Sequence, residues 1–205
     1  MGFAFALIFA IFAVPLGLYI WYVAIHVPAR GRRQQEESWR PLAQRIGGQL
    51  VATSGTSRFH VLTVPYGAAM VRALVFDRAV HDQALPQMRA EFGGWRTFVQ
   101  ADVPGGRGVP LSIEPRGGSR GGVPIGRPAL EQRHAITPLL ATQPNQIGWR
   151  ITNDVEHALA VLGDRYSYVQ AGPSFVSLEI PGVCTDPTVI EAALRVVGTL
   201  AQPTA

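Results

Sequence analysis

The sequence contains no lysine, a single cysteine and no charged side chain in its first 27 residues. The lone Cys184 excludes an intrachain disulfide and any metal site built from several cysteines. The absence of lysine excludes a Walker-type phosphate loop, which requires a lysine after its glycines. No Gly-x-Ser-x-Gly elbow, paired-carboxylate motif or dinucleotide fingerprint is present. The sequence therefore predicts no catalytic residue, no cofactor and no metal site, and we expect that the chain is not an enzyme.

Every basic residue is an arginine, and 18 arginines against 14 acidic residues give a net charge of +4. Arg30, Arg32 and Arg33 directly follow the uncharged segment, and from residue 34 onward 15 arginines stand against 14 acids. Most of the chain thus lacks a basic stripe of the kind that follows a phosphate backbone. We therefore expect no nucleic-acid partner.

The uncharged N-terminal segment predicts a transmembrane anchor over residues 1–28. Residues 2–27 correspond to roughly 39 Å of helix at ~1.5 Å per residue, enough to cross about 30 Å of hydrocarbon with some tilt. Tyr19, Trp21 and Tyr22 lie near its end, where aromatic rings favour the headgroup region. The alternative is a cleaved signal peptide, which typically has a basic start and a shorter apolar run.

The basic residues behind the anchor predict its orientation. No basic side chain precedes the segment, whereas Arg30, Arg32 and Arg33 follow it in a juxtamembrane linker at 29–34. By the positive-inside rule the N-terminus faces outward and the rest of the chain lies in the cytoplasm, at the inner membrane. The same arginines are expected to attract anionic lipid headgroups, by about 1 kcal/mol per charge.

Small residues form one face of the predicted anchor. Their spacings of four, four, three and four place them on one side of a helix, and small residues let another helix approach closely in lipid. We therefore expect other transmembrane subunits as partners of this face. The alternative is that alanine and glycine are simply common in such segments. The face comprises Gly2, Ala6, Ala10, Ala13 and Gly17.

Residues 35–205 predict one soluble α+β domain with a mainly antiparallel sheet and helices packed on one face. An amphipathic helix is expected at 35–48, where Trp39 either packs in the core or dips into the membrane interface. Apolar alternation, with Gly and Pro between the runs, predicts a meander of four strands. These strands are expected at 49–54, 58–65, 69–76 and 94–103, with a short helix at 78–92.

The second half of the domain has a less regular pattern. Residues 104–128 are rich in Gly, Pro and Arg and predict a long loop, or a loosely held hairpin around the apolar run 109–113. Beyond it the pattern predicts a strand, a helix, two strands and a last helix, which Asp186 caps and Pro187 begins. The expected ranges are 147–152, 154–162, 166–169, 175–180 and 186 onward, with Val189, Ile190, Ala193, Val197 and Leu200 on the apolar face of the last helix.

Two other features have both a functional and a structural interpretation. The Arg-Gly tract at 116–122 has no interleaved aromatic residues, so we interpret it as a solvated loop, with anionic lipid or an acidic protein surface as the functional alternative. The five histidines show no metal-ligand spacing to one another or to Cys184. His26, near the predicted membrane interface, is either a polar interfacial residue or a ligand for a pigment or haem of a neighbouring subunit.

These features predict a single-pass, non-catalytic accessory or scaffold subunit of a larger bacterial membrane complex, for example a photosynthetic or respiratory one. The general plan is similar to that of single-pass bacterial subunits such as the H subunit of purple-bacterial reaction centres, and this similarity concerns topology. The alternative is a membrane-tethered ligand-binding or sensory module, which should contain a concave apolar pocket. A third hypothesis, an enzyme acting near the membrane, requires convergent His, Asp or Arg side chains in that pocket.

Overall fold

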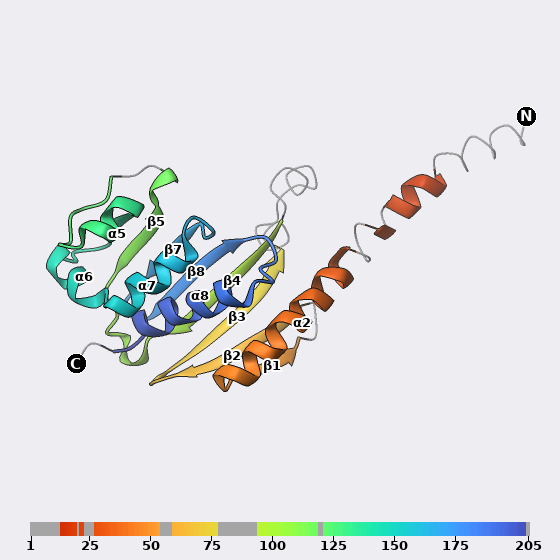
Figure 1. The fold of residues 1–205 in the computed structure, drawn as a ribbon, viewed down its shortest axis with the longest axis horizontal. Coiled ribbons are helices and arrows are strands. Elements are labelled where there is room, and N and C mark those ends of the chain that lie inside the picture. The colour runs from red at the N-terminus through yellow and green to blue at the C-terminus, as the bar shows by residue number, and fades with distance from the viewer. Residues whose placement is uncertain are drawn as a thin grey trace, which may run out of the picture.

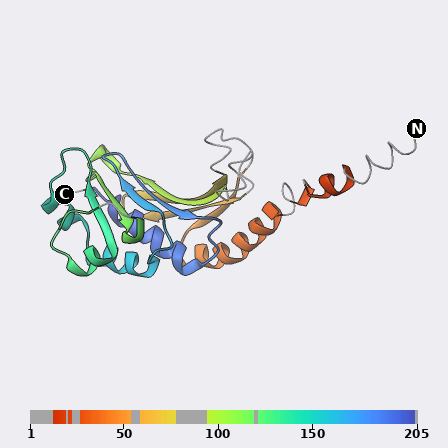
Figure 2. The same cartoon turned by 90° about the horizontal axis from the view of Figure 1, so that it is seen from above.

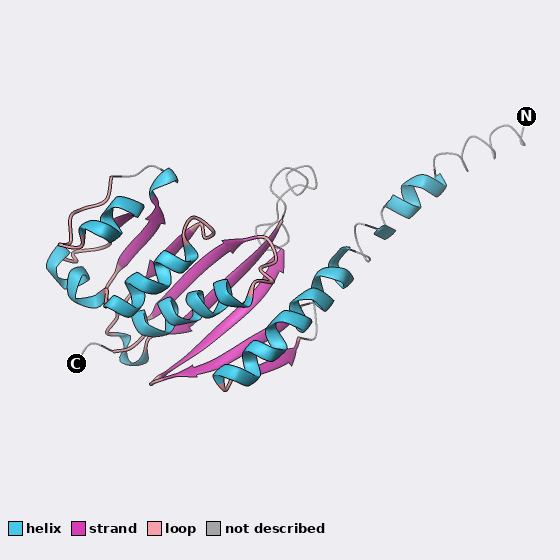
Figure 3. Cartoon of the chain, in the orientation of Figure 1, coloured by secondary structure: helices cyan, strands magenta, loops and turns pink. Residues whose placement is uncertain are grey.

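The computed structural model describes residues 13–19, 21–22, 27–53, 59–77, 94–118 and 121–203, and residues 13–19 are helical. Figure 3 shows the alternation of helices and strands. The elements are α2 (Val27–Ile46), β1 (Gln49–Ala52), β2 (His60–Tyr66), β3 (Ala69–Asp77), β4 (Trp95–Asp102), η2 (Pro104–Gly106), β5 (Leu111–Pro115), η3 (Arg116–Gly118), α5 (Pro128–Arg133), β6 (His134–Pro138), α6 (Pro144–Arg150), α7 (Asn153–Leu162), β7 (Tyr168–Ala171), β8 (Phe175–Pro181) and α8 (Pro187–Leu200).

The strands form one eight-stranded sheet in the order β1-β2-β3-β4-β8-β7-β5-β6, and every neighbouring pair is antiparallel (Figure 1). The helices lie on one side of this sheet (Figure 2). There α2 contacts β1 and β2, α8 contacts β3, β4 and β8, and α7 packs beside α8. The chain therefore has an α+β fold with an antiparallel sheet, as the sequence predicts.

The predicted anchor falls largely on residues that the structure does not describe. Within the described ranges, no helix is both long enough and apolar enough to cross a membrane. Gly2, Ala6 and Ala10 of the predicted packing face lie outside those ranges, as does the helix expected at 78–92. Ala13 and Gly17 lie in the helical residues 13–19. Anchor and packing face stay predictions.

The four-strand meander is confirmed, with each strand within a few residues of its expected range. β2 shows why the pattern is informative, because His60, Leu62 and Val64 are buried and alternate with less buried residues. Such alternation is expected for a sheet covered by helices on one face only. The apolar side chains of this half therefore point to the layer of helices.

The last helix is also confirmed. The Asp186 carboxylate accepts a hydrogen bond from the backbone N–H of Thr188 (2.9 Å), and Pro187 occupies the first turn. All five residues of the predicted apolar face are buried. Near the end of α8 the Tyr66 ring lies against Gly198, where an added Cβ would come within 2.4 Å of the ring. A larger side chain at this position would push α8 away from β2.

The prediction of a loop over 104–128 is wrong for part of its length. β5 lies inside this range and pairs with β6 on one side and β7 on the other, so it is an interior strand of the sheet. Leu111 and Ile113 are fully buried. The apolar run that we expect at 109–113 is thus placed by long-range pairing, which the surrounding glycines and prolines conceal in the sequence.

The strand predicted at 147–152 is wrong, because this segment belongs mainly to α6. Pro144 begins that helix, and the side-chain oxygen of Gln146 accepts a hydrogen bond from the N–H of Gln143 (3.0 Å). Ile147 and Ile151 are buried four residues apart, which is helical spacing. The sequence patterns also fail to predict α5 and β6, which have only six and five residues.

Two boundaries differ from the prediction. The cap of α7 is Thr152, whose side chain accepts a hydrogen bond from the N–H of Val155, so the helix begins at Asn153 and not at residue 154. β7 begins at Tyr168 instead of residue 166. Tyr166 precedes the strand, and its buried hydroxyl lies 2.8 Å from Nδ1 of His134. This buried contact joins the start of β7 to β6.

Candidate functional site

Helix α2 is the element that joins the predicted anchor to the sheet. It runs without interruption from Val27 to Ile46, so the stretch 29–34 that we predict as a linker is helical. Arg30, Arg32 and Arg33 lie in its first half with exposed side chains. The basic stretch is therefore the beginning of a helix whose second half belongs to the folded domain.

The second half of α2 is packed into the core. Trp39 has no exposed surface, and its indole Nε1–H donates a hydrogen bond to the carbonyl oxygen of Cys184 (3.0 Å). Leu42 and Ala43 on the same side of the helix are also buried. Of the two alternatives for Trp39, core packing is confirmed. This hydrogen bond links α2 to the segment that precedes α8.

A buried glutamine fastens the middle of α2 to β2. The N–H of His60 donates to Oε1 of Gln35 (2.9 Å), and Nε2 of Gln35 donates to the carbonyl oxygen of His60 (3.0 Å). Gln35 has no exposed surface. The side-chain amide of Gln35 thus forms hydrogen bonds with both the N–H and the C=O of His60. A residue of an adjacent antiparallel strand pairs with its partner in the same way. No sequence pattern indicates this role, because Gln35 and His60 are 25 residues apart.

Charged groups surround His60 on the side of α2. Nε2 of His60 lies 3.8 Å from Oε2 of Glu36, and Glu36 also forms an ion pair with Arg40 one turn further along. Burial lowers the pKa of His60 below its ordinary value, the Glu36 carboxylate opposes this shift, and Arg32 and Arg40 add to it. The hydrogen bond from Arg40 holds the pKa of Glu36 below its ordinary value.

The buried histidines predict a loss of stability in mild acid. Burial lowers the pKa of both His60 and His134 in the folded chain, so the unfolded chain binds their protons at higher pH. The free energy of unfolding is therefore expected to fall as the pH drops below about 6.5, and to level off below the folded pKa values. Urea unfolding between pH 7.5 and 5 measures this effect above the range in which carboxylates titrate. His60→Gln and His134→Gln should each reduce the fall, and a stability that rises towards pH 5 would contradict the assignment.

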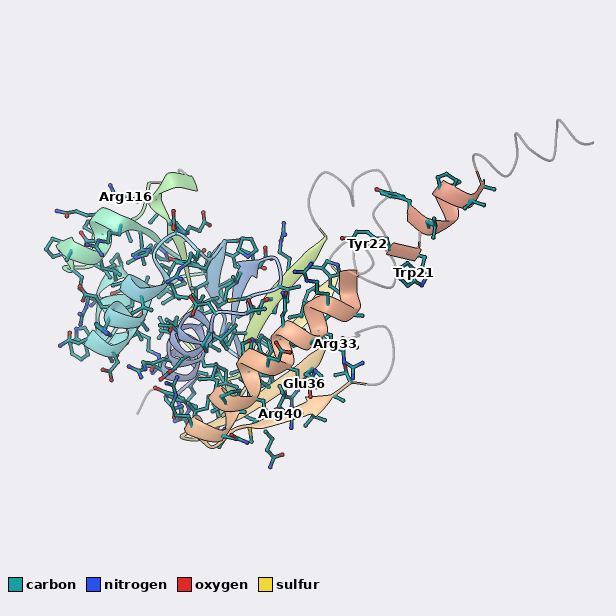
Figure 4. All side chains as sticks on the ribbon, turned by 45° about the vertical axis from the view of Figure 1, so that its right-hand side comes forward. Trp21, Tyr22, Arg33, Glu36, Arg40 and Arg116 are labelled. Atoms are coloured by element: carbon teal, nitrogen blue, oxygen red, sulfur yellow. The ribbon has the colours of Figure 1, made fainter. Side chains whose placement is uncertain are left out.

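The residues predicted at the membrane interface lie along the N-terminal part of the chain. Tyr19, Trp21 and Tyr22 are each at least half exposed. Figure 4 shows Trp21 and Tyr22 beyond the end of α2 that carries Arg33, and Arg116 of the Arg-Gly tract at the opposite end of the molecule. The tract therefore does not join the basic stretch of α2 in one surface.

The face of the sheet opposite the helices is not covered by any described element (Figure 2). On it the rings of Phe76 and Phe98 stack with their centroids 4.4 Å apart, and Nε of Arg96 lies 3.3 Å from Oε1 of Glu179. Beside these side chains lies a row of polar residues, as expected for the face of an antiparallel sheet that is exposed to water. The row crosses all eight strands through Gln49, Thr63, Arg72, Gln100, Ser177, Gln170, Ser112 and Thr137.

A shallow hollow of 220 Å³ lies at one end of this face. Ligand pockets usually exceed about 300 Å³ and are mostly apolar, whereas this hollow is lined by both charged and apolar side chains. Arg72 and Asp102 line it beside Met70 and Phe175, and no histidine does. Within the described ranges, no group of His, Cys, Asp or Glu has the arrangement of a metal site. The hollow gives little support to the ligand-binding and enzyme hypotheses.

No family model and no curated protein matches the chain. Among solved structures, the crystal structure of the mycobacterial trehalose monomycolate transport factor A, TtfA, is similar, with a TM-score of 0.52. The two chains are 11% identical over 83% of this chain and 94% of that chain. At this identity the similarity concerns the fold. The chain thus has an α+β fold that resembles that of TtfA.

Proposed function

We propose that this chain is a non-catalytic accessory protein of a membrane transport assembly. In this proposal the N-terminal segment is a single-pass anchor, and the sheet domain is held at the cytoplasmic face of the inner membrane. The observation that carries it is the continuity of α2, which begins beside the predicted anchor and ends in the core of the domain. In this proposal the anchor continues directly into α2, so that this helix sets both the height and the orientation of the domain above the bilayer.

Several features support an assembly role. Arg30, Arg32 and Arg33 are exposed at the start of α2 and suited to anionic lipid headgroups. The small-residue face of the anchor offers a contact for other transmembrane subunits. The fold similarity to a transport factor favours a transport assembly over the photosynthetic or respiratory complexes that the sequence also suggests. The ligand-binding alternative has weaker support because the described hollow is small.

Insertions between Arg33 and Gln34 test whether α2 connects the anchor rigidly to the domain. Two alanines rotate the anchor relative to the domain by about 200°, whereas four rotate it by about 400°, which is only about 40° from the original direction. If orientation matters, the shorter insertion should strongly reduce the yield of membrane partners that co-purify in mild detergent. The four-residue insertion should retain most of the yield.

A flexible insertion is the matched control. Four Gly-Ser residues at the same place have the length of the four-alanine insertion but interrupt the helix, so they should reduce the yield as the two alanines do. Equal yields of membrane partners from all three variants would show that the connection between the anchor and the domain need not be rigid. A reporter that is active only outside the cytosol, fused to the C-terminus, should stay inactive. Recovery of the chain as a monomer without membrane partners would overturn the proposed function.

A further inference from the structure

The first half of α2, residues 27–36, is packed against two residues at the start of β2. At Gly31 an added Cβ would come within 3.4 Å of the Phe59 ring, so the helix passes close to this ring. One turn further along, Gln35 forms hydrogen bonds with both backbone groups of His60. The Glu36 carboxylate lies beside the His60 ring, 3.8 Å from Nε2. Phe59 and His60 therefore form the surface that holds the first half of α2.

A proline separates this part of α2 from the part that is packed in the core. Pro41 lies inside the helix and has no N–H, so the carbonyl group of Glu37 lacks its usual intrahelical hydrogen bond. Beyond the proline, Leu42 is buried and Arg45 forms an ion pair with Glu191 of α8. The first half of the helix can therefore move about this point while the second half stays in place.

The His60 ring is buried in an environment that suits its neutral form. The residue is 6% exposed, and its buried Nδ1 atom has no hydrogen-bond partner among the described residues. A protonated ring carries an N–H group at both nitrogens, so protonation would leave a buried donor at Nδ1 unsatisfied. This cost adds to the cost of burying the charge itself.

The charged side chains that act on this ring lie on α2. Arg32, Glu36 and Arg40 follow one another at four-residue spacing, which places them on one side of the helix. Burial lowers the pKa of His60, the Glu36 carboxylate opposes this shift, and both arginines add to it. The packed position of α2 therefore favours the neutral ring.

The two strands beside β2 carry few charged residues. β1 pairs with His60 through Ala52 and has no charged residue. β3 has two, Arg72 and Asp77. Arg72 lines the hollow on the opposite face of the sheet, and Asp77 pairs with Trp95 at the end of the strand. The groups of α2 are therefore the ones through which the ring senses the position of the helix.

We propose that His60 is a proton-dependent latch, a contact between α2 and β2 that opens in mild acid. Protonation of the ring releases residues 27–36 from β2, and they move about Pro41 while the second half of α2 stays in the core. Mild acid favours the released state because a solvated ring binds its proton with a pKa of about 6.5, above that of the buried ring. This inference goes beyond the proposed function, and only its effect on the position of the domain below the anchor rests on that function.

Hydrogen exchange at single amides of the full chain in detergent micelles tests the latch. The amide of His60 reports the release, because it donates to Gln35, and the amide of Val99 in β4 reports opening of the whole sheet. After correction for the intrinsic effect of pH, exchange at His60 relative to Val99 should rise at least about threefold between pH 7.5 and 5. An unchanged ratio would overturn the proposal.

Substitutions identify the group that titrates. His60→Gln should abolish the rise, and His134→Gln should leave it unchanged. Glu36→Gln removes the carboxylate that favours the protonated ring, so the rise should become at least about twofold larger. Glu37→Gln, at an exposed neighbouring position, is the matched control and should have no effect. A rise that persists in His60→Gln, or that Glu36→Gln reduces, would contradict the latch. The Glu36→Gln variant keeps the ring, so the test stands even if His60→Gln does not fold.

Spin labels locate the point about which the helix moves. Labels at Arg30→Cys and Gln100→Cys, in a Cys184→Ala background in lipid nanodiscs, should give a narrow distance distribution at pH 7.5 and a broader one at pH 5. The pair Gln44→Cys and Gln100→Cys, whose helical label lies beyond Pro41, should stay narrow at both. Broadening of both pairs, or of neither, would overturn the proposal. Because these measurements need no partner complex, their failure leaves the insertion experiment unaffected.

Discussion

Replacing Trp39 with alanine is expected to lower the free energy of unfolding by about 4 kcal/mol. The side chain has no exposed surface, so its removal leaves a large cavity between α2 and the sheet. It also removes the hydrogen bond to the carbonyl oxygen of Cys184. Trp39→Phe should cost less, about 2 kcal/mol, because the ring still fills most of the space. Urea unfolding followed by far-UV circular dichroism measures both losses without relying on tryptophan fluorescence.

Trp149 provides the matched control for this substitution. It lies in α6 and is 89% exposed, so Trp149→Ala should change the free energy of unfolding by less than about 0.5 kcal/mol. The two substitutions remove the same atoms, and only burial distinguishes them. Similar losses for both variants would mean that α2 is not packed in the core.

Replacing Gln35 with alanine is expected to lower the free energy of unfolding by about 3 kcal/mol. The change removes no large apolar surface, but it leaves the N–H and the carbonyl oxygen of His60 without their buried partner. Each unsatisfied buried group costs about 1 to 3 kcal/mol. Gln35→Glu should not restore stability, because a carboxylate accepts from the N–H but cannot donate to the carbonyl oxygen.

The neighbouring Gln34 is the control, since it lies in the same helix with an exposed side chain. Gln34→Ala should leave the free energy of unfolding unchanged within about 0.5 kcal/mol. Hydrogen exchange provides a second measurement, because the amide of His60 should exchange faster in Gln35→Ala and not in Gln34→Ala. A Gln35→Ala variant as stable as Gln34→Ala would show that the amide does not fasten α2 to β2.

The elements that the sequence predicts well have local patterns long enough to be specific. β2 alternates buried and less buried residues, β3 is a run of nine residues in which only Arg72 and Asp77 are polar, and α8 has a cap, a proline and a full apolar stripe. By contrast, β5 and β6 have five residues each, and their places in the sheet depend on pairing with distant segments. Helix α6 is mistaken for a strand because its few apolar residues do not define a period over so short a length.

The candidate site was predictable only in part. The basic cluster at Arg30, Arg32 and Arg33 follows from local sequence, whereas the burial of Trp39 is one of two alternatives that the sequence leaves open. The role of Gln35 does not, because a glutamine on an amphipathic helix has no feature that predicts a bond to the backbone of His60. The position of β1 at an edge of the sheet also required the structure, since only the strand order identifies it as an outer strand.

One measurement tests most directly whether the basic stretch after the predicted anchor is rigidly joined to the sheet. Spin labels at Arg30→Cys and Gln100→Cys, in a Cys184→Ala background, place one probe at the start of α2 and one on β4. In the full chain in lipid nanodiscs, pulsed electron spin resonance should give a single narrow distance distribution. A broad distance distribution would mean that α2 is interrupted before Gln35 and that a flexible linker connects the basic stretch to the domain.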